Sequence, residues 1–136
     1  MGRKMMIVLK ISMLSAIMLL LVSINSVGAG EVVSCRYLQS EGKNILLELS
    51  ITAPVPHMVI VVQRIPPAAS IVNASPGYKK YDAQRGVAKW MLTGLKPGPM
   101  QMVMTLDKPV HKGEVTGEIR YKHPATGHMV NMAISP

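Results

Sequence analysis

The chain has 136 residues, of which 49% are hydrophobic, 16% are charged and 4% are aromatic, and its formal net charge is +8. This length and apolar content favour one folded domain and exclude a disordered chain, which would be poor in aliphatic residues and rich in charge. The single cysteine, Cys35, excludes an intramolecular disulfide framework and a zinc site built from several cysteines.

The first residues of the chain have the three-part layout of a secretory signal peptide. Basic residues within the first ten positions precede an apolar run over 11–22, and small and polar residues follow this run. The apolar run has 12 residues, short of the roughly 20 that cross the hydrocarbon of a membrane. We therefore predict a signal peptide at 1–29 and one mature domain at 30–136, exported to the periplasm, the cell surface or the extracellular space.

Two alternatives for the N-terminus stay open. An uncleaved membrane anchor would need the apolar stretch to continue to Val27 across Asn25. A lipoprotein would be modified on Cys35, but Glu31 stands four residues before this cysteine, where an apolar or small residue is expected. Cleavage after position 29 would leave twelve basic and seven acidic residues, a net charge of +5, so part of the basic character is a targeting signal.

From Val32 onward the sequence follows the two-residue period of β-strands. Strand patterns cover 45–53, 58–65, 88–92, 100–106, 115–122 and 129–134. Glycine and proline separate these segments, which recur at a spacing of roughly ten residues. The pattern predicts an all-β fold, namely an immunoglobulin-like antiparallel β-sandwich of seven or eight strands, with a small closed barrel as the alternative.

A few residues stand out as candidates for the core. Trp90 is the only tryptophan, and we expect its large ring at the centre of the core. Met100, Met102 and Met104 share one face of a strand, where methionine fills the space that phenylalanine, absent from this chain, would occupy. Cys35 lies in an alternating apolar row, so we expect a small buried side chain rather than a nucleophile.

The stretch 65–104 carries the most distinctive pattern of the chain. Its marks are Pro66-Pro67, Asp82, Gly86, Trp90 and Leu95 with Pro97-Gly98. This pattern resembles the conserved repeat β-sandwich domain of unknown function found in bacterial and archaeal surface proteins. The chain departs from that family at Ala68, where glycine is usual, and in its single copy and basic charge. The resemblance implies an envelope or extracellular module used for spacing or adhesion, and it does not imply an enzyme.

Histidine and methionine support a different hypothesis, a copper site. His57-Met58 and His128-Met129 are adjacent pairs, and imidazole and thioether are ligands that suit copper in an oxidising compartment. These four residues are therefore the candidate metal ligands. The competing explanation is that methionines fill the core while histidines lie in exposed turns.

The remaining motifs favour a binding module over an enzyme. No nucleophile elbow and no phosphate-binding loop is present, so we predict no catalytic residue and no cofactor-binding residue. The basic residues are too dispersed, and too poor in neighbouring aromatics, for a nucleic-acid interface. We expect a non-enzymatic structural or interaction module of the cell envelope, for adhesion or assembly, with no stable membrane span after cleavage. Its expected partner is another envelope protein or an anionic envelope polymer; the alternative is a small periplasmic copper-binding protein.

Overall fold

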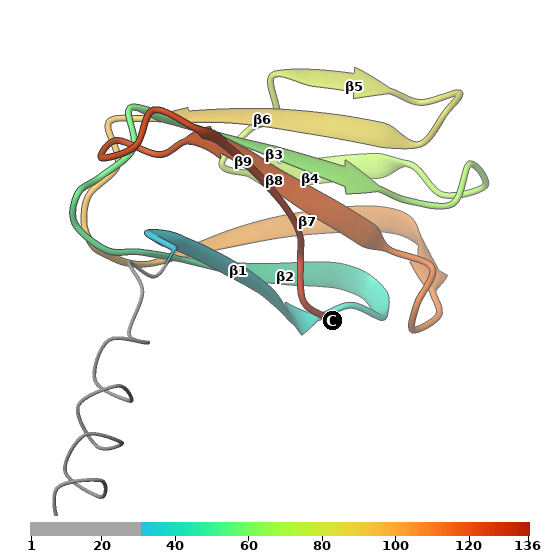
Figure 1. The fold of residues 1–136 in the computed structure, drawn as a ribbon. Helices are drawn as coiled ribbons and strands as arrows, with labels where there is room; N and C mark the ends of the chain where they lie inside the picture. The colour runs from blue at the N-terminus through green and yellow to red at the C-terminus, as the bar shows by residue number, and fades with distance from the viewer. Residues whose placement is uncertain (1–30) are drawn as a thin grey trace, which may run out of the picture. The chain divides into compact units, whose positions relative to one another are not determined.

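The computed structural model describes residues 31–136, and the signal peptide predicted at 1–29 lies outside the described residues. Within this range the chain forms nine strands and no helix, and Val32–Pro136 make up one compact unit. The strands form two antiparallel sheets that face each other as two layers (Figure 1). The prediction of an all-β sandwich is therefore confirmed for these residues.

The two sheets contain four and five strands. The four-stranded sheet has the order β1-β2-β7-β4, with β1 (Val33–Gln39), β2 (Gly42–Ile51), β7 (Gly98–Val110) and β4 (Ile71–Ser75). The five-stranded sheet has the order β5-β6-β3-β8-β9, with β5 (Lys80–Asp82), β6 (Val87–Thr93), β3 (Met58–Arg64), β8 (Thr116–Lys122) and β9 (Met129–Ala133).

The expected number of seven or eight strands is too low for residues 31–136, which form nine. The predicted strand segments include neither the three-residue β5 nor β4, whose sequence does not alternate. A register shift between Ile71 and Asn73 in its pairing with β7 leaves Val72 and Asn73 both exposed. Such a bulge breaks the two-residue period on which prediction of a strand depends.

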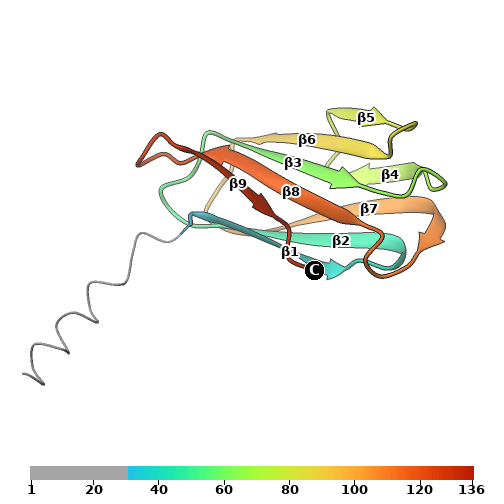
Figure 2. The same cartoon turned by 45° about the vertical axis from the view of Figure 1, so that its right-hand side comes forward.

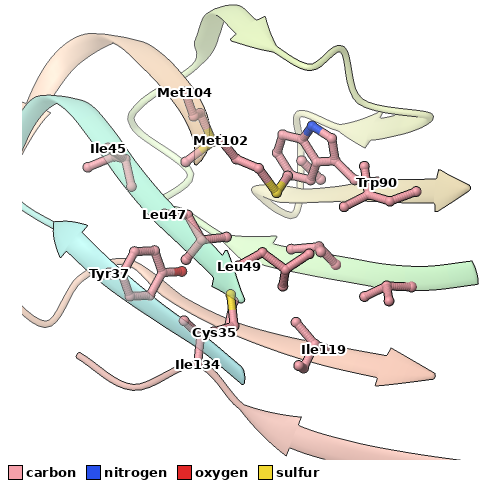
Figure 3. Close-up of a cluster of buried hydrophobic side chains, with 14 of the residues drawn as sticks. Cys35, Tyr37, Ile45, Leu47, Leu49, Trp90, Met102, Met104, Ile119 and Ile134 are labelled. Atoms are coloured by element: carbon pink, nitrogen blue, oxygen red, sulfur yellow. The ribbon is translucent and has the colours of Figure 1, made fainter. Parts of the chain in front are cut away.

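The core lies between the sheets and has the composition that the sequence predicts. Trp90 is only 1% exposed, and its indole Nε1 donates a hydrogen bond to the carbonyl oxygen of Pro76 at 2.8 Å. Met102 and Met104 are buried in the same cluster (Figure 3), and Met100 is half-buried against it. Cys35 is buried there too, so the expectation of a core cysteine is confirmed.

The turn between β5 and β6 has the local geometry that its sequence predicts. Asp82 Oδ1 accepts hydrogen bonds from the backbone amides of Gln84 and Arg85, at 3.1 and 3.2 Å. Gly86 has a φ of 67°, and a Cβ at this position would collide with the carbonyl oxygen of Ile65. Glycine is therefore required here both by the backbone conformation and by the close approach of another chain segment.

The C-terminal residues close one side of the sandwich. After β9 the chain leaves the five-stranded sheet, and Ser135 forms a parallel bridge with Arg36 of β1 (Figure 2). The amide of Tyr37 donates to the carbonyl of Ser135 at 2.9 Å, and the amide of Ser135 donates to the carbonyl of Cys35 at 3.3 Å. The last residues therefore join an edge of the four-stranded sheet to the five-stranded sheet.

Candidate functional site

Alternation along each strand of the five-stranded sheet places one set of side chains on its outer face. In the register, Ile60 of β3 stands between Met91 of β6 and Arg120 of β8. Lys122 of β8 is opposite Met129 of β9 in the same way. Met91 is 43% exposed and Met129 is 68% exposed, so this face presents large apolar side chains to solvent beside basic ones.

One end of this outer face contains a pocket of about 530 Å³. The connections β2–β3 and β8–β9 both contribute to its wall. Its apolar lining comes from Val55, Met58, Ile60, Tyr121, Pro124 and Met129. Its basic and imidazole lining comes from Arg120, Lys122, His57 and His123. No Asp or Glu is among the described residues that line it.

The β8–β9 turn fixes the imidazole of His123. The backbone amide of Ala125 donates to His123 Nδ1 at 3.1 Å, and the amide of Gly127 donates to the carbonyl of His123 at 2.8 Å. Gly127 has a φ of 73°, which allows the tight return of the chain. Because Nδ1 accepts a hydrogen bond, the neutral ring carries its proton on Nε2 and can donate from that atom. This tautomer suits an anion and not a metal ion, which needs an unprotonated ring nitrogen.

The positive charges of the pocket are only partly neutralised. Arg120 Nη2 donates to Glu118 Oε1 at 2.7 Å, while its Nε is buried without a hydrogen-bond partner among residues 31–136. Lys122 forms no salt bridge with any residue that the structure describes. Burial tends to raise the pKa of Glu118, but its hydrogen bonds and ion pairs with Arg120 and Arg64 outweigh this and hold the pKa below its usual value.

The pocket contains three of the four residues predicted as metal ligands. His57, Met58 and Met129 line it, whereas His128 does not. His123 lines it instead, a residue that the search for adjacent His-Met pairs missed. His123 directly follows the strand predicted at 115–122, and this position is the sequence signal that could have identified it. Among residues 31–136, no group of three or more His, Cys, Asp or Glu side chains could hold a metal ion.

The outer face of the four-stranded sheet has a groove of a different character. This groove, of about 420 Å³, is lined by Ser34, Cys35, Arg36, Glu48, Ser50 and Ser135. Arg36 and Glu48 form a salt bridge of 3.1 Å across it, so its charges are balanced. Burial raises the pKa of the Cys35 thiol to about 12, so almost no thiolate is present at neutral pH.

Two further findings concern membrane-spanning helices and similarity to known proteins. Residues 31–136 include no helix with the length and apolar character needed to cross a membrane. Comparison with known proteins does not test the resemblance to the repeat domain of surface proteins, which therefore stays a prediction. No protein-family model, no curated protein and no solved structure matches this chain.

Proposed function

We propose that the protein is an exported, non-enzymatic interaction module of the cell envelope that binds an anionic partner through the outer face of its five-stranded sheet. The observation that carries this proposal is the charge of that face. Its strands present five basic residues, Lys80, Lys89, Arg64, Arg120 and Lys122. They present two acidic residues, Asp82 and Glu118. Such an excess attracts an anionic protein surface or an anionic envelope polymer.

An immunoglobulin-like topology is part of the proposal, and the strand order supports it. The sheets β1-β2-β7-β4 and β6-β3-β8-β9 correspond to the immunoglobulin orders A-B-E-D and C′-C-F-G. Two departures go with this correspondence. Strand β4 precedes β5 and β6 in the chain, although it occupies the place of strand D. The buried Trp90 lies on β6 instead of β3, the strand in the place of C.

The chemistry of two side chains supports a non-enzymatic role. The thiol of Cys35 is buried and protonated at neutral pH, so it is a poor nucleophile. The carboxylate of Glu118 is held in its ionised form by Arg64 and Arg120, which makes it a weak general base. The resemblance to the repeat domain of surface proteins points in the same direction.

The experiment that tests this function is binding of the purified protein to a soluble anionic polymer, inorganic polyphosphate, at increasing salt. We expect the double variant Lys80→Glu and Lys89→Glu, in register on β5 and β6, to weaken binding about tenfold or more. The matched control is Arg36→Glu with Lys43→Glu on the four-stranded sheet, which changes net charge equally and should leave binding within about twofold. Equal losses in the two double variants would mean that only net charge matters.

Export is tested separately, by expressing the full chain in a bacterium and determining the N-terminal sequence of the protein. The proposal expects the protein in the periplasm or the medium, starting at or next to Gly30. A full-length protein retained in the cytoplasm would contradict the export half of the proposal.

Copper binding is the second candidate function, and one observation favours it: His57, Met58 and Met129 line the same pocket. The charges of Arg120 and Lys122 in that lining oppose a cation. Competition for Cu(I) against a chromophoric chelator decides between the two. Stoichiometric transfer of Cu(I) to the protein, lost in His57→Ala and in Met58→Ala, would favour the copper function.

A further inference from the structure

We infer that the pocket on the five-stranded sheet binds a single-chain anionic amphiphile, namely a free fatty acid in its ionised form. The acyl chain would lie over Met58, Ile60 and Met129, and the carboxylate would face Lys122 and His123. This inference rests on the proposed function, because it names a small-molecule class for the same sheet face. It adds a defined site and a ligand with two chemical parts.

The apolar part of the ligand follows from the shape and lining of the pocket. Its volume of about 530 Å³ lies within the roughly 300–1,000 Å³ that small-molecule sites occupy. Met58 and Ile60 come from β3 and Met129 from β9, so the apolar side chains line the pocket from two strands of one sheet face. Met129 is 68% exposed, and an acyl chain that covered it would remove this apolar surface from water.

The anionic part follows from the charges. Lys122 has no ion pair within residues 31–136, and Arg120 Nε has no hydrogen-bond partner there. The Ala125 amide donates to His123 Nδ1, which leaves Nε2 as a donor. Lys122 and His123 Nε2, with no carboxylate in the lining, form a site that favours an anion and disfavours both an amine and a metal cation.

A recessed position favours a free fatty acid over the surface of a bilayer. Val55 from the β2–β3 connection and Pro124 from the β8–β9 connection contribute to the wall of the pocket. Met58 and Ile60 are half-buried in this hollow, which one chain can enter, whereas insertion into a membrane requires apolar groups that protrude.

The test is a calorimetric titration of the purified full chain with sodium dodecanoate below its micellar concentration. We expect one saturable site. Acetate has the same head group without the chain, and dodecyltrimethylammonium has the same chain with the opposite charge. Each should bind about tenfold or more weakly than dodecanoate.

Two variants locate the site. Met129→Glu places a carboxylate in the pocket at an exposed position, and we expect it to weaken dodecanoate binding about tenfold or more. Met91→Glu is the matched control, because Met91 is exposed on the same sheet face but does not line the pocket. Lys122→Gln should weaken binding roughly threefold to tenfold, and Lys43→Gln on the four-stranded sheet should leave it unchanged.

Three outcomes would overturn the inference. The first is equal binding of dodecanoate and its cationic counterpart. The second is equal loss in Met129→Glu and Met91→Glu. The third is binding only to phosphatidylglycerol vesicles, which would indicate a membrane surface instead of a pocket. Polyphosphate binding depends on Lys80 and Lys89, outside the pocket lining, so failure of this inference is distinguishable from failure of the proposed function.

Discussion

The outer faces of the two sheets differ in chemistry although both belong to the same sandwich. On the four-stranded sheet, a polar groove carries a balanced pair, Arg36 and Glu48. On the five-stranded sheet, exposed methionines lie beside basic residues, and a pocket without acidic lining residues opens at one end. The core requires only the inward half of each strand to be apolar, so the outward half is free to carry recognition.

The largest expected effect tests whether the inner and outer faces of one strand are independent. Trp90 and Met91 are neighbours on β6 that point to opposite faces. We expect Trp90→Ala to lower the free energy of unfolding by about 3–5 kcal/mol, because it removes the largest fully buried side chain of residues 31–136. Met91→Ala should change it by about 0.5 kcal/mol or less. Urea denaturation measures both, and comparable losses would mean that the outer face also carries stability.

A second prediction concerns the closed side of the sandwich, where the two sheets meet. A Cβ on Gly117 would lie 2.6 Å from Ile134 Cδ1 and 2.9 Å from the carbonyl oxygen of Val62. We expect Gly117→Ala to lower the free energy of unfolding by about 1–3 kcal/mol through overpacking. The control is Gly77→Ala, where a Cβ meets nothing within 4 Å. A neutral effect at Gly117 would show that the C-terminal residues move aside easily.

A third prediction concerns Glu118, an acidic residue on the outer face of the five-stranded sheet. Glu118 bonds both Arg64 and Arg120, and its pKa is below the ordinary value of 4.5. Its stabilising contribution is therefore present above pH 4.5 and is lost as the pH falls through the lowered pKa. Glu118→Gln should cost about 0.5–1 kcal/mol at pH 7 and less at pH 3. Urea denaturation at both pH values checks this, and an equal cost at pH 3 would contradict it.

The smallest effect is expected on the four-stranded sheet. The Arg36 side chain is 64% exposed, so its salt bridge with Glu48 is screened by water and salt. Arg36→Ala should change the free energy of unfolding by about 0.5 kcal/mol or less, and the change should shrink further in high salt. Thermal melts at low and high ionic strength measure it. A loss comparable to that of Glu118→Gln would remove the contrast between the two faces.

The sequence predicted the core better than the pocket, for a physical reason. Burial on one face imposes a two-residue period that can be read along a single strand, so Trp90, Met102 and Cys35 were identified. Strand β4 was missed because a bulge interrupts its period. Long-range pairing of β3 with β8 brings the two walls of the pocket together, and no local pattern encodes that pairing.

The pocket also shows which part of the histidine hypothesis a sequence can support. The pair His57-Met58 marks one wall of the pocket, and the pair His128-Met129 marks the other through Met129. Which histidine of the β8–β9 turn lines the pocket depends on the hydrogen bonds of that turn, which place His123 there and not His128. The charge of the lining depends on Arg120 and Lys122, whose alternation along β8 puts both on the outer face.

The bridge between Ser135 and β1 has a consequence for the order in which the chain folds. Within residues 31–136, strand β1 obtains a partner at its free edge only from Ser135, which is far from it in the sequence. Until Ser135 is in place, that edge is open to pairing with other molecules. Contacts between such distant residues favour slow folding. A fusion partner joined directly to Pro136 would hinder formation of this bridge, so a flexible linker belongs between them.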